Sequence, residues 1–169
     1  STWEGAAEFD AAQDFKIIRA QTQTLLPSKK TLAMAREIVV AENITRVLFG
    51  AAAPLGLLAS PLRKLGVKNI VGMTQGHETG WAMTPGTRQA LRKIGNDTDY
   101  LTYISEYTHQ KIAKALSPDA AARMRRIVPG VNVTDFSPAN AGAGNQFRTE
   151  LGWLDRPVIV CVSRLMARK

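Results

Sequence analysis

The sequence predicts an α/β domain built on a Rossmann-like parallel sheet with flanking helices. Three observations lead to this prediction. Short apolar runs alternate with segments of helical periodicity, turn or capping residues separate the two, and the run VIVCV at 158–162 is apolar throughout. Strands that alternate with helices favour a parallel sheet, and a strand covered on both of its faces needs no polar alternation.

The first predicted elements are a short strand at 14–19, DFKIIR, and a helix from Ser28 to about Asn43. Pro27 and Ser28 suit a helix start, and apolar residues follow at helical spacing. The next apolar run, 46–49, is the second predicted strand, which ends abruptly at Gly50. A buried strand that opens into a loop is therefore expected here.

A second helix is predicted at 54–65, with Leu55, Leu58, Leu62 and Leu65 on one face. Gly66 is expected to end this helix in a left-handed conformation. A third strand follows at 67–73. The loop after it would lie at the carboxyl end of a parallel strand, which is the edge of an open sheet where ligands bind.

The third predicted helix begins at Thr84 and Pro85, a capping residue followed by a proline suited to the first helical position, and Gly95 should stop it. A fourth strand is predicted at 100–104. Ser105 should then cap another helix, with Ile112, Ala115 and Leu116 as core positions, and a short helix restarts at Ser117.

The segment 132–145 is rich in Gly, Ala, Pro and Asn, which favours a linker or a long surface loop. A short helix at 146–151 and an apolar strand at 157–162 come after it. We predict one domain at 1–140, and a linker with the start of a second domain at 141–169. Because the chain stops soon after a strand with nothing left to pair with, we expect a fragment cut inside that second domain.

Composition limits the class of protein. The chain has 169 residues, 45% hydrophobic and 21% charged, which is enough for one ordinary core and argues against disorder. No apolar run approaches the length of a membrane-spanning helix, and the first residues lack the order of a signal peptide. The one cysteine, Cys161, is expected to be a small core residue without a disulfide partner, which fits a reducing compartment.

The net charge of +8 favours a polyanionic partner. Basic residues cluster at 88–93 and 123–126, which we place on two helices; a solvated basic face is the alternative for each cluster. Neither cluster has interleaved aromatic residues of the kind that bind single-stranded nucleic acid. Nucleic acid is therefore not the expected partner.

Two loops contain the candidate functional residues. The first is the stretch MTQGHETGW, where Gln75, His77 and Glu78 flank Gly76 and could bond to ligand hydroxyls; a polar turn with a helix-capping carboxylate is the alternative. In the second loop, Arg164 and Lys169 could converge on one diphosphate, with a solvated basic loop as the alternative. One cysteine and two distant histidines give no metal-site spacing.

These landmarks, taken in order, resemble a known family. The runs FGAAAPLGLLAS, TQGHETGWAMTPGTRQALRKIG, YISEYTHQKIAKAL, IVPGVNVTDFSP and VCVSRLMARK are similar to those of retaining family-4 glycosyltransferases with two Rossmann-like domains, the GT-B architecture. Within that family the likeness is to the phosphatidylinositol mannosyltransferases. It extends over almost the whole chain, and the stretch from Gly76 to Gly95 is its most specific part.

The resemblance implies most of the N-terminal, acceptor-side GT-B domain plus the first strand of the nucleotide-sugar domain. It implies that Arg164 and Lys169 bind the donor diphosphate, and that Gln75, in the catalytic loop, lies with Gly76, His77 and Glu78 near the sugar and the acceptor. The family usually has histidine at the position of Gln75; glutamine keeps hydrogen-bonding capacity but cannot titrate.

The implied activity is transfer of mannose from GDP-mannose to an anionic phosphatidylinositol mannoside, with neither a cofactor nor a metal. The expected location is cytoplasmic, peripheral at the inner face of the plasma membrane. The family's glycine-rich loop would precede Ser1 and its carboxylate pair would follow Lys169, so we expect the fragment alone to be inactive. Alternatives are a family-4 transferase with another donor or acceptor, and a non-catalytic basic module that binds anionic lipid or nucleic acid.

Overall fold

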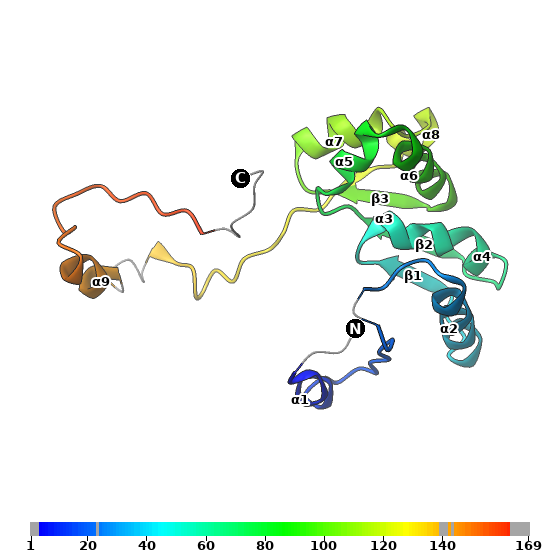
Figure 1. Cartoon of the computed structure of the whole chain (residues 1–169), viewed down its shortest axis with the longest axis horizontal. Helices are drawn as coiled ribbons and strands as arrows, with labels where there is room; N and C mark the ends of the chain where they lie inside the picture. Colours follow the sequence, from blue (N-terminus) through cyan, green and yellow to red (C-terminus); the bar gives the residue numbers. More distant parts are fainter. Residues whose placement is uncertain (1–3, 23, 139–141, 143, 163–169) are drawn as a thin grey trace. The chain divides into compact units, whose positions relative to one another are not determined.

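The computed structural model describes residues 4–22, 24–138, 142 and 144–162. The chain divides into two compact units, Ser1–Pro129 and Gly130–Lys169, and each is described by itself. The first unit contains the sheet and most of the helices (Figure 1). The described part of the second includes the short helix α9 (Asn145–Glu150), at the place where the sequence predicts a helix.

The sheet has four parallel strands in the order β1-β2-β3-β4, which confirms the predicted fold class. The strands are β1 (Arg46–Phe49), β2 (Asn69–Met73), β3 (Tyr100–Tyr103) and β4 (Arg125–Arg126). Val47 pairs with Ile70, Gly72 with Leu101, and Thr102 with Arg125. Three of the predicted strands are found, and the two-residue strand β4 is an addition that the sequence did not indicate.

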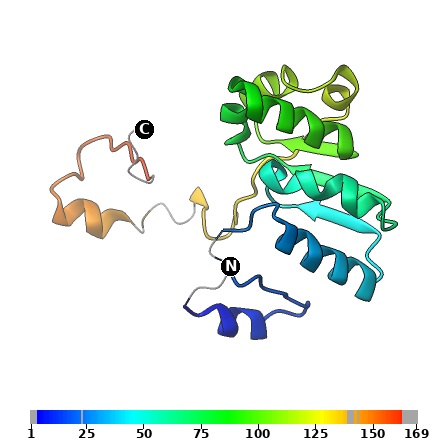
Figure 2. The same ribbon diagram turned by 45° about the vertical axis from the view of Figure 1, so that its right-hand side comes forward.

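Helices connect the strands and pack beside the sheet (Figures 1 and 2). In chain order the helices of the first unit are α1 (Ala6–Ala11), α2 (Lys29–Ala41), α3 (Ala52–Leu55), the 3₁₀ turn η1 (Gly56–Leu58), α4 (Ala59–Arg63), α5 (Glu78–Met83), α6 (Pro85–Asp97), α7 (Glu106–Ala113) and α8 (Pro118–Ala122). Two buried clusters hold them together. One contains Leu91, Ile94 and Ile112, and the other contains Leu62 and Ile70.

Caps fix the starts of three helices where the sequence predicts them. The Ser28 hydroxyl accepts from the Thr31 amide at 3.1 Å, and Ser105 and Thr108 form a reciprocal capping box. Ser117 caps α8 in the same way. Each bond satisfies an amide that has no partner inside the helix.

The predicted helix at 54–65 is present from Pro54 to Arg63, but it is not a regular α-helix, because the segment passes from α3 through a 3₁₀ turn into α4. Leu58 and Leu62 are buried as expected, whereas Leu65 is 39% exposed, because α4 ends at Arg63 and Leu65 lies beyond its last turn. Gly66 has a φ of 96°, which confirms the predicted left-handed end.

Helix α6 does not stop at Gly95 but continues to Asp97. Gly95 is buried, and a Cβ there would lie 2.8 Å from Cδ2 of Leu116, so close helix packing explains this glycine. The helix ends at Thr98, whose amide and hydroxyl both donate to the Ile94 carbonyl. At the other end Pro85 occupies the first turn as predicted, but the Thr84 side chain makes no capping bond.

Two predicted strands, 14–19 and 157–162, are not strands. A strand needs a neighbour for its backbone bonds, and no described strand pairs with either segment. The apolar run near the carboxyl end is consequently exposed, with Ile159 at 98% and Val162 at 93%. Cys161 is exposed as well, which corrects its prediction as a core residue.

The basic cluster at 123–126 does not form a helical face. Arg123 follows α8, and its guanidinium donates to the carbonyls of Gly95, Thr98 and Asp99 near the end of α6. A cation bonded to the last carbonyls of a helix is a favourable arrangement. Arg125, in β4, lies over the Tyr100 ring at 5.2 Å. This part of the cluster is therefore engaged in holding the fold.

An ion pair anchors α1. Arg19 donates from Nε and Nη2 to the two carboxylate oxygens of Asp10, at 2.6 and 2.5 Å. These hydrogen bonds, and the guanidinium charge, lower the pKa of Asp10 below its ordinary 3.8. A lowered pKa in the folded state means that the pair stabilises the fold above about pH 3.8 and loses that effect as the pH falls through the lower folded-state value.

We therefore expect Asp10→Asn to speed hydrogen exchange of the α1 amides at neutral pH, measured by mass spectrometry. The parent chain should show the same loss of protection only when the pH falls below 3.8. The matched control is Glu8→Gln in the same helix, because Glu8 is exposed. Equal exchange in Asp10→Asn and the parent would contradict the anchoring role.

Candidate functional site at the carboxyl edge of the sheet

The carboxyl ends of β1, β2 and β3 lie at one edge of the sheet, and the loops that follow them are in contact. Thr74, directly after β2, donates from its amide and hydroxyl to the Thr102 carbonyl at 3.3 and 2.6 Å. A Cβ at Gly76 would lie 3.6 Å from Cδ1 of Ile104 and 3.8 Å from Cγ2 of Thr108. Loop residues far apart in the sequence thus form one surface where ligands of such sheets bind.

Glu78 lies beneath this surface. It is the first residue of α5, a helix that the sequence did not predict, and its side chain is 0% exposed. Oε2 accepts from the Gln75 amide at 3.0 Å, and Oε1 accepts from the Ala53 amide at 3.5 Å. Buried carboxylates are costly unless such donors surround them. Glu78 therefore joins the loop after β1 to the loop after β2, from a position inside the fold.

Gln75 lies at the exposed side of the same loop. Its Nε2 donates to the Gly50 carbonyl at 3.2 Å, which orients the amide. Among the described residues, no protein group donates to its side-chain oxygen. That oxygen can accept a hydrogen bond from a ligand hydroxyl.

His77 lies between the buried carboxylate and the surface. Gly76, just before it, has a φ of 96°, a conformation that favours glycine and turns the chain into α5. Nε2 of His77 is 3.0 Å from the Ala53 carbonyl oxygen and 3.4 Å from Oε1 of Glu78. The side chain is 43% exposed, so one part of the ring is held by the protein and another faces outward.

The structure adds groups that the sequence analysis missed. The backbone of Gly50 and Ala53 supplies partners to all three polar side chains of the loop, and no residue-type pattern could reveal this. His109, in α7, stacks on Tyr103 with ring centroids 4.5 Å apart. The sequence offers one hint of this stacking: Tyr103 ends a predicted strand, and His109 follows in the first turns of the next predicted helix.

Comparison with known proteins adds an independent observation. No family model matches the sequence. The chain is 41% identical over 99% of its length to the GDP-mannose-dependent alpha-(1-6)-phosphatidylinositol monomannoside mannosyltransferase of Mycolicibacterium smegmatis. A monoacylated-acceptor counterpart from Corynebacterium glutamicum is 40% identical over 98% of the chain, and the Mycobacterium tuberculosis protein is 39% identical over 99%.

Along nearly its whole length the chain is similar to phosphatidylinositol monomannoside mannosyltransferases. It spans 43–44% of the length of these curated relatives. The family resemblance noted from the sequence motifs is therefore confirmed over almost every residue of the chain.

Two of the predicted site residues, Arg164 and Lys169, lie outside the described residues. The structure brings together the other four, Gln75 to Glu78, with Glu78 inside and the others nearer the surface. Within the described ranges no group of three or more His, Cys, Asp or Glu side chains could hold a metal ion. No described helix is long and apolar enough to cross a membrane.

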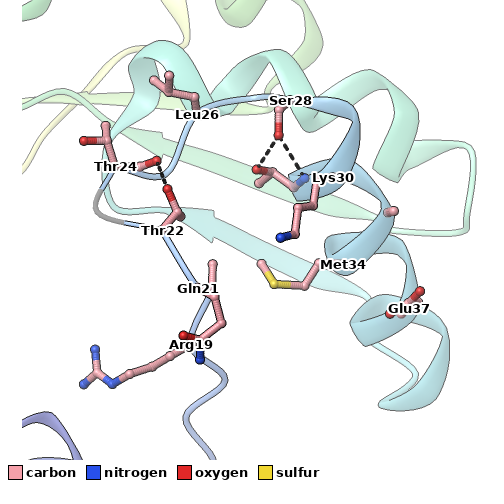
Figure 3. Close-up of a pocket in the computed structure, with 12 residues that line it drawn as sticks. Arg19, Gln21, Thr22, Thr24, Leu26, Ser28, Lys30, Met34 and Glu37 are labelled. Atoms are coloured by element: carbon pink, nitrogen blue, oxygen red, sulfur yellow. Dashed lines mark hydrogen bonds between the residues drawn. The ribbon is translucent and has the colours of Figure 1, made fainter. Parts of the chain in front are cut away.

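A cavity of about 630 Å³ lies elsewhere, between the segment 19–28 and α2 (Figure 3). Leu26 and Met34 supply apolar surface, Lys30 supplies a cation, and Arg19 is paired with Asp10. None of the residues from Gly50 to Ala53 or from Gln75 to Glu78 lines it. We place the candidate site at the sheet edge because that edge gathers a buried carboxylate, an imidazole and an amide, whereas the cavity has no comparable set.

Proposed function

We propose that the protein to which this chain belongs transfers mannose from GDP-mannose to a phosphatidylinositol mannoside glycolipid. The observation that carries the proposal is the identity of about 40%, over 98–99% of the chain, to mannosyltransferases that share this donor and acceptor class. The parallel sheet with a polar carboxyl edge supports it, because that is where a sugar nucleotide or an acceptor would bind.

The proposal gives the residues separate roles. Arg164 and Lys169 bind the donor diphosphate and neutralise the leaving nucleotide as the glycosidic bond breaks. Gln75 and His77 offer hydrogen-bonding groups to sugar or acceptor hydroxyls, and Glu78 holds their loop. Residues 1–140 form the acceptor-side domain, and 141–169 begin the nucleotide-sugar domain. The mannose is transferred with retention of its anomeric configuration.

Membrane contact belongs to the same proposal. The acceptor is an anionic lipid, and Arg88, Arg92 and Lys93 on α6 are exposed basic residues that could meet the inner membrane surface. Such a contact contributes about 1 kcal/mol per basic residue near the surface. Arg88 also donates to the Lys114 carbonyl and Lys93 pairs with Asp97, but all three α6 residues stay exposed. Arg123 is half-buried against the end of α6, so we favour α6 over the cluster at 123–126.

The test is a transfer assay with the complete protein, vesicles that contain phosphatidylinositol monomannoside, and radiolabelled GDP-mannose. We expect one added mannose in the lipid fraction, and none when GDP-mannose is replaced by UDP-glucose. Transfer from UDP-glucose, or to a soluble acceptor only, would favour another nucleotide sugar or acceptor. No transfer from any donor would overturn the proposal.

The proposed contact between α6 and an anionic membrane is tested separately. In vesicle co-sedimentation at low salt, the complete protein should bind vesicles with anionic lipid better than neutral vesicles. Charge neutralisation at Arg88, Arg92 and Lys93 should weaken that binding. Equal binding to both kinds of vesicle would remove the basic face of α6 from the proposal.

A further inference from the structure

The proton position on His77 follows from its two nearest partners. Nε2 is 3.0 Å from the Ala53 carbonyl oxygen, which can only accept a hydrogen bond. The second neighbour of Nε2, Oε1 of Glu78 at 3.4 Å, already accepts from the Ala53 amide. Both partners are therefore acceptors, so Nε2 must carry the proton. In the neutral ring, Nδ1 is then an unprotonated acceptor.

The surroundings of Glu78 favour a proton on Nε2 of His77. Its partners among the described residues are N–H groups: the Ala53 amide, the Gln75 amide and the imidazole. The carboxylate therefore needs no proton of its own to satisfy its neighbours. Because the side chain is fully buried, water does not compete for these bonds. The His77 ring cannot rotate about its bonds without losing both Nε2 contacts.

We propose that Glu78 is a positioning residue, which together with the Ala53 carbonyl fixes the proton of His77 on Nε2 and presents Nδ1 as a hydrogen-bond acceptor at the ligand-binding edge. The ligand group that matches such an acceptor is a hydroxyl, as found on a sugar or an inositol ring. The ring position and tautomer are inferred from this structure alone. The identity of the hydroxyl rests on the proposed function.

The position of the proton is tested by nitrogen NMR on the full chain labelled at its histidines, at about pH 8.5, where a histidine with its ordinary pKa is neutral. We expect the His77 spectrum to show a protonated Nε2 and a bare Nδ1. Glu78→Gln should shift the His77 ring nitrogens and leave those of His109 unchanged. The matched control, Glu106→Gln, alters the carboxylate that lies 3.4 Å from His109 and should leave His77 unchanged.

A proton on Nδ1 of His77 in the parent chain would overturn the inference. Unchanged His77 shifts in a folded Glu78→Gln variant would overturn the role of Glu78. If Glu78→Gln fails to fold, Glu78→Asp tests the same point, because the shorter side chain moves the carboxylate away from Nε2 of His77. The ring nitrogen shifts of His77 should then change, and unchanged shifts in the folded variant would overturn the role of Glu78.

Two substitutions in the complete protein separate the nitrogens by function. The amide of asparagine lies near the Nδ1 position of histidine, and that of glutamine lies near Nε2. If Nδ1 accepts from a ligand hydroxyl, His77→Gln should lose roughly 2- to 10-fold in kcat/KM for the mannose acceptor, and His77→Asn should keep more activity. The reverse order would mean that His77 only holds the loop.

The two experiments fail independently. If the complete protein transfers no sugar, the proposed function is wrong while the nitrogen spectra still decide the proton position. If transfer is normal and the His77 proton lies on Nδ1, this inference is wrong while the proposed function stands.

Discussion

Ile94→Ala is expected to lower the free energy of unfolding by about 2–5 kcal/mol, the usual range for such a truncation in a core. Ile94 is 0% exposed and belongs to the cluster that joins α6 to β3 and α7. It also contacts η1, because a Cβ at Gly56 would lie 2.5 Å from Cγ2 of Ile94. Urea denaturation followed by circular dichroism measures the effect.

Gly56 provides the matched partner for this experiment. Its backbone is helical, so Gly56→Ala should destabilise the parent through the clash with Ile94, by about 1–3 kcal/mol. In the Ile94→Ala background the added methyl group enters the new space, and its cost should fall. The exposed residue Val40 is the control, and Val40→Ala should change stability by less than about 0.5 kcal/mol. Additive effects of the Gly56 and Ile94 substitutions would show that the two residues are not in contact.

Arg164→Ala in the complete protein is expected to weaken GDP-mannose binding by roughly 10- to 150-fold. That range is the loss of one hydrogen bond to a charged group, about 1.5–3 kcal/mol, at tenfold per 1.4 kcal/mol. Lys169→Ala should have an effect of the same order. Calorimetric titration with GDP-mannose measures both constants.

Arg164→Lys and Arg168→Ala are the controls for that prediction. Lysine keeps the charge but not the planar fork of arginine, so it should recover only part of the binding. Arg168 is a neighbouring cation that has no assigned role at the diphosphate, and its loss should have little effect. Equal losses in Arg164→Ala and Arg168→Ala would favour a general effect of basic charge.

The confirmed predictions depend on interactions between residues that are close in the sequence. Serine hydroxyls cap their own helices, Gly66 turns left-handed after α4, and three apolar runs pair in parallel. Each depends on residues a few positions apart, or on a pattern repeated along the chain. The polar loop at 75–78 could be found in the same way, because it follows a predicted strand.

The errors arose where distant residues decide the outcome. Gly95 looked like a helix stop, but close packing against Leu116, between α7 and α8, and against Ala120 of α8 explains it. The runs at 14–19 and 157–162 have strand-like composition but no strand to pair with among the described residues. Arg123 looked like surface charge and instead bonds to three carbonyls near the end of α6.

The sequence by itself determined the α/β class, the succession of β1, β2 and β3 along the chain, and the family likeness, because periodicity and motifs are properties of neighbouring residues. Only the tertiary structure placed Glu78 inside the fold and His77 between it and the surface. Both side chains meet the backbone of Ala53, whose amide donates to Glu78 and whose carbonyl lies against His77, 25 and 24 positions away in the chain. Backbone amides and carbonyls are the same in every residue but proline, so no sequence pattern can show which of them a buried carboxylate will meet.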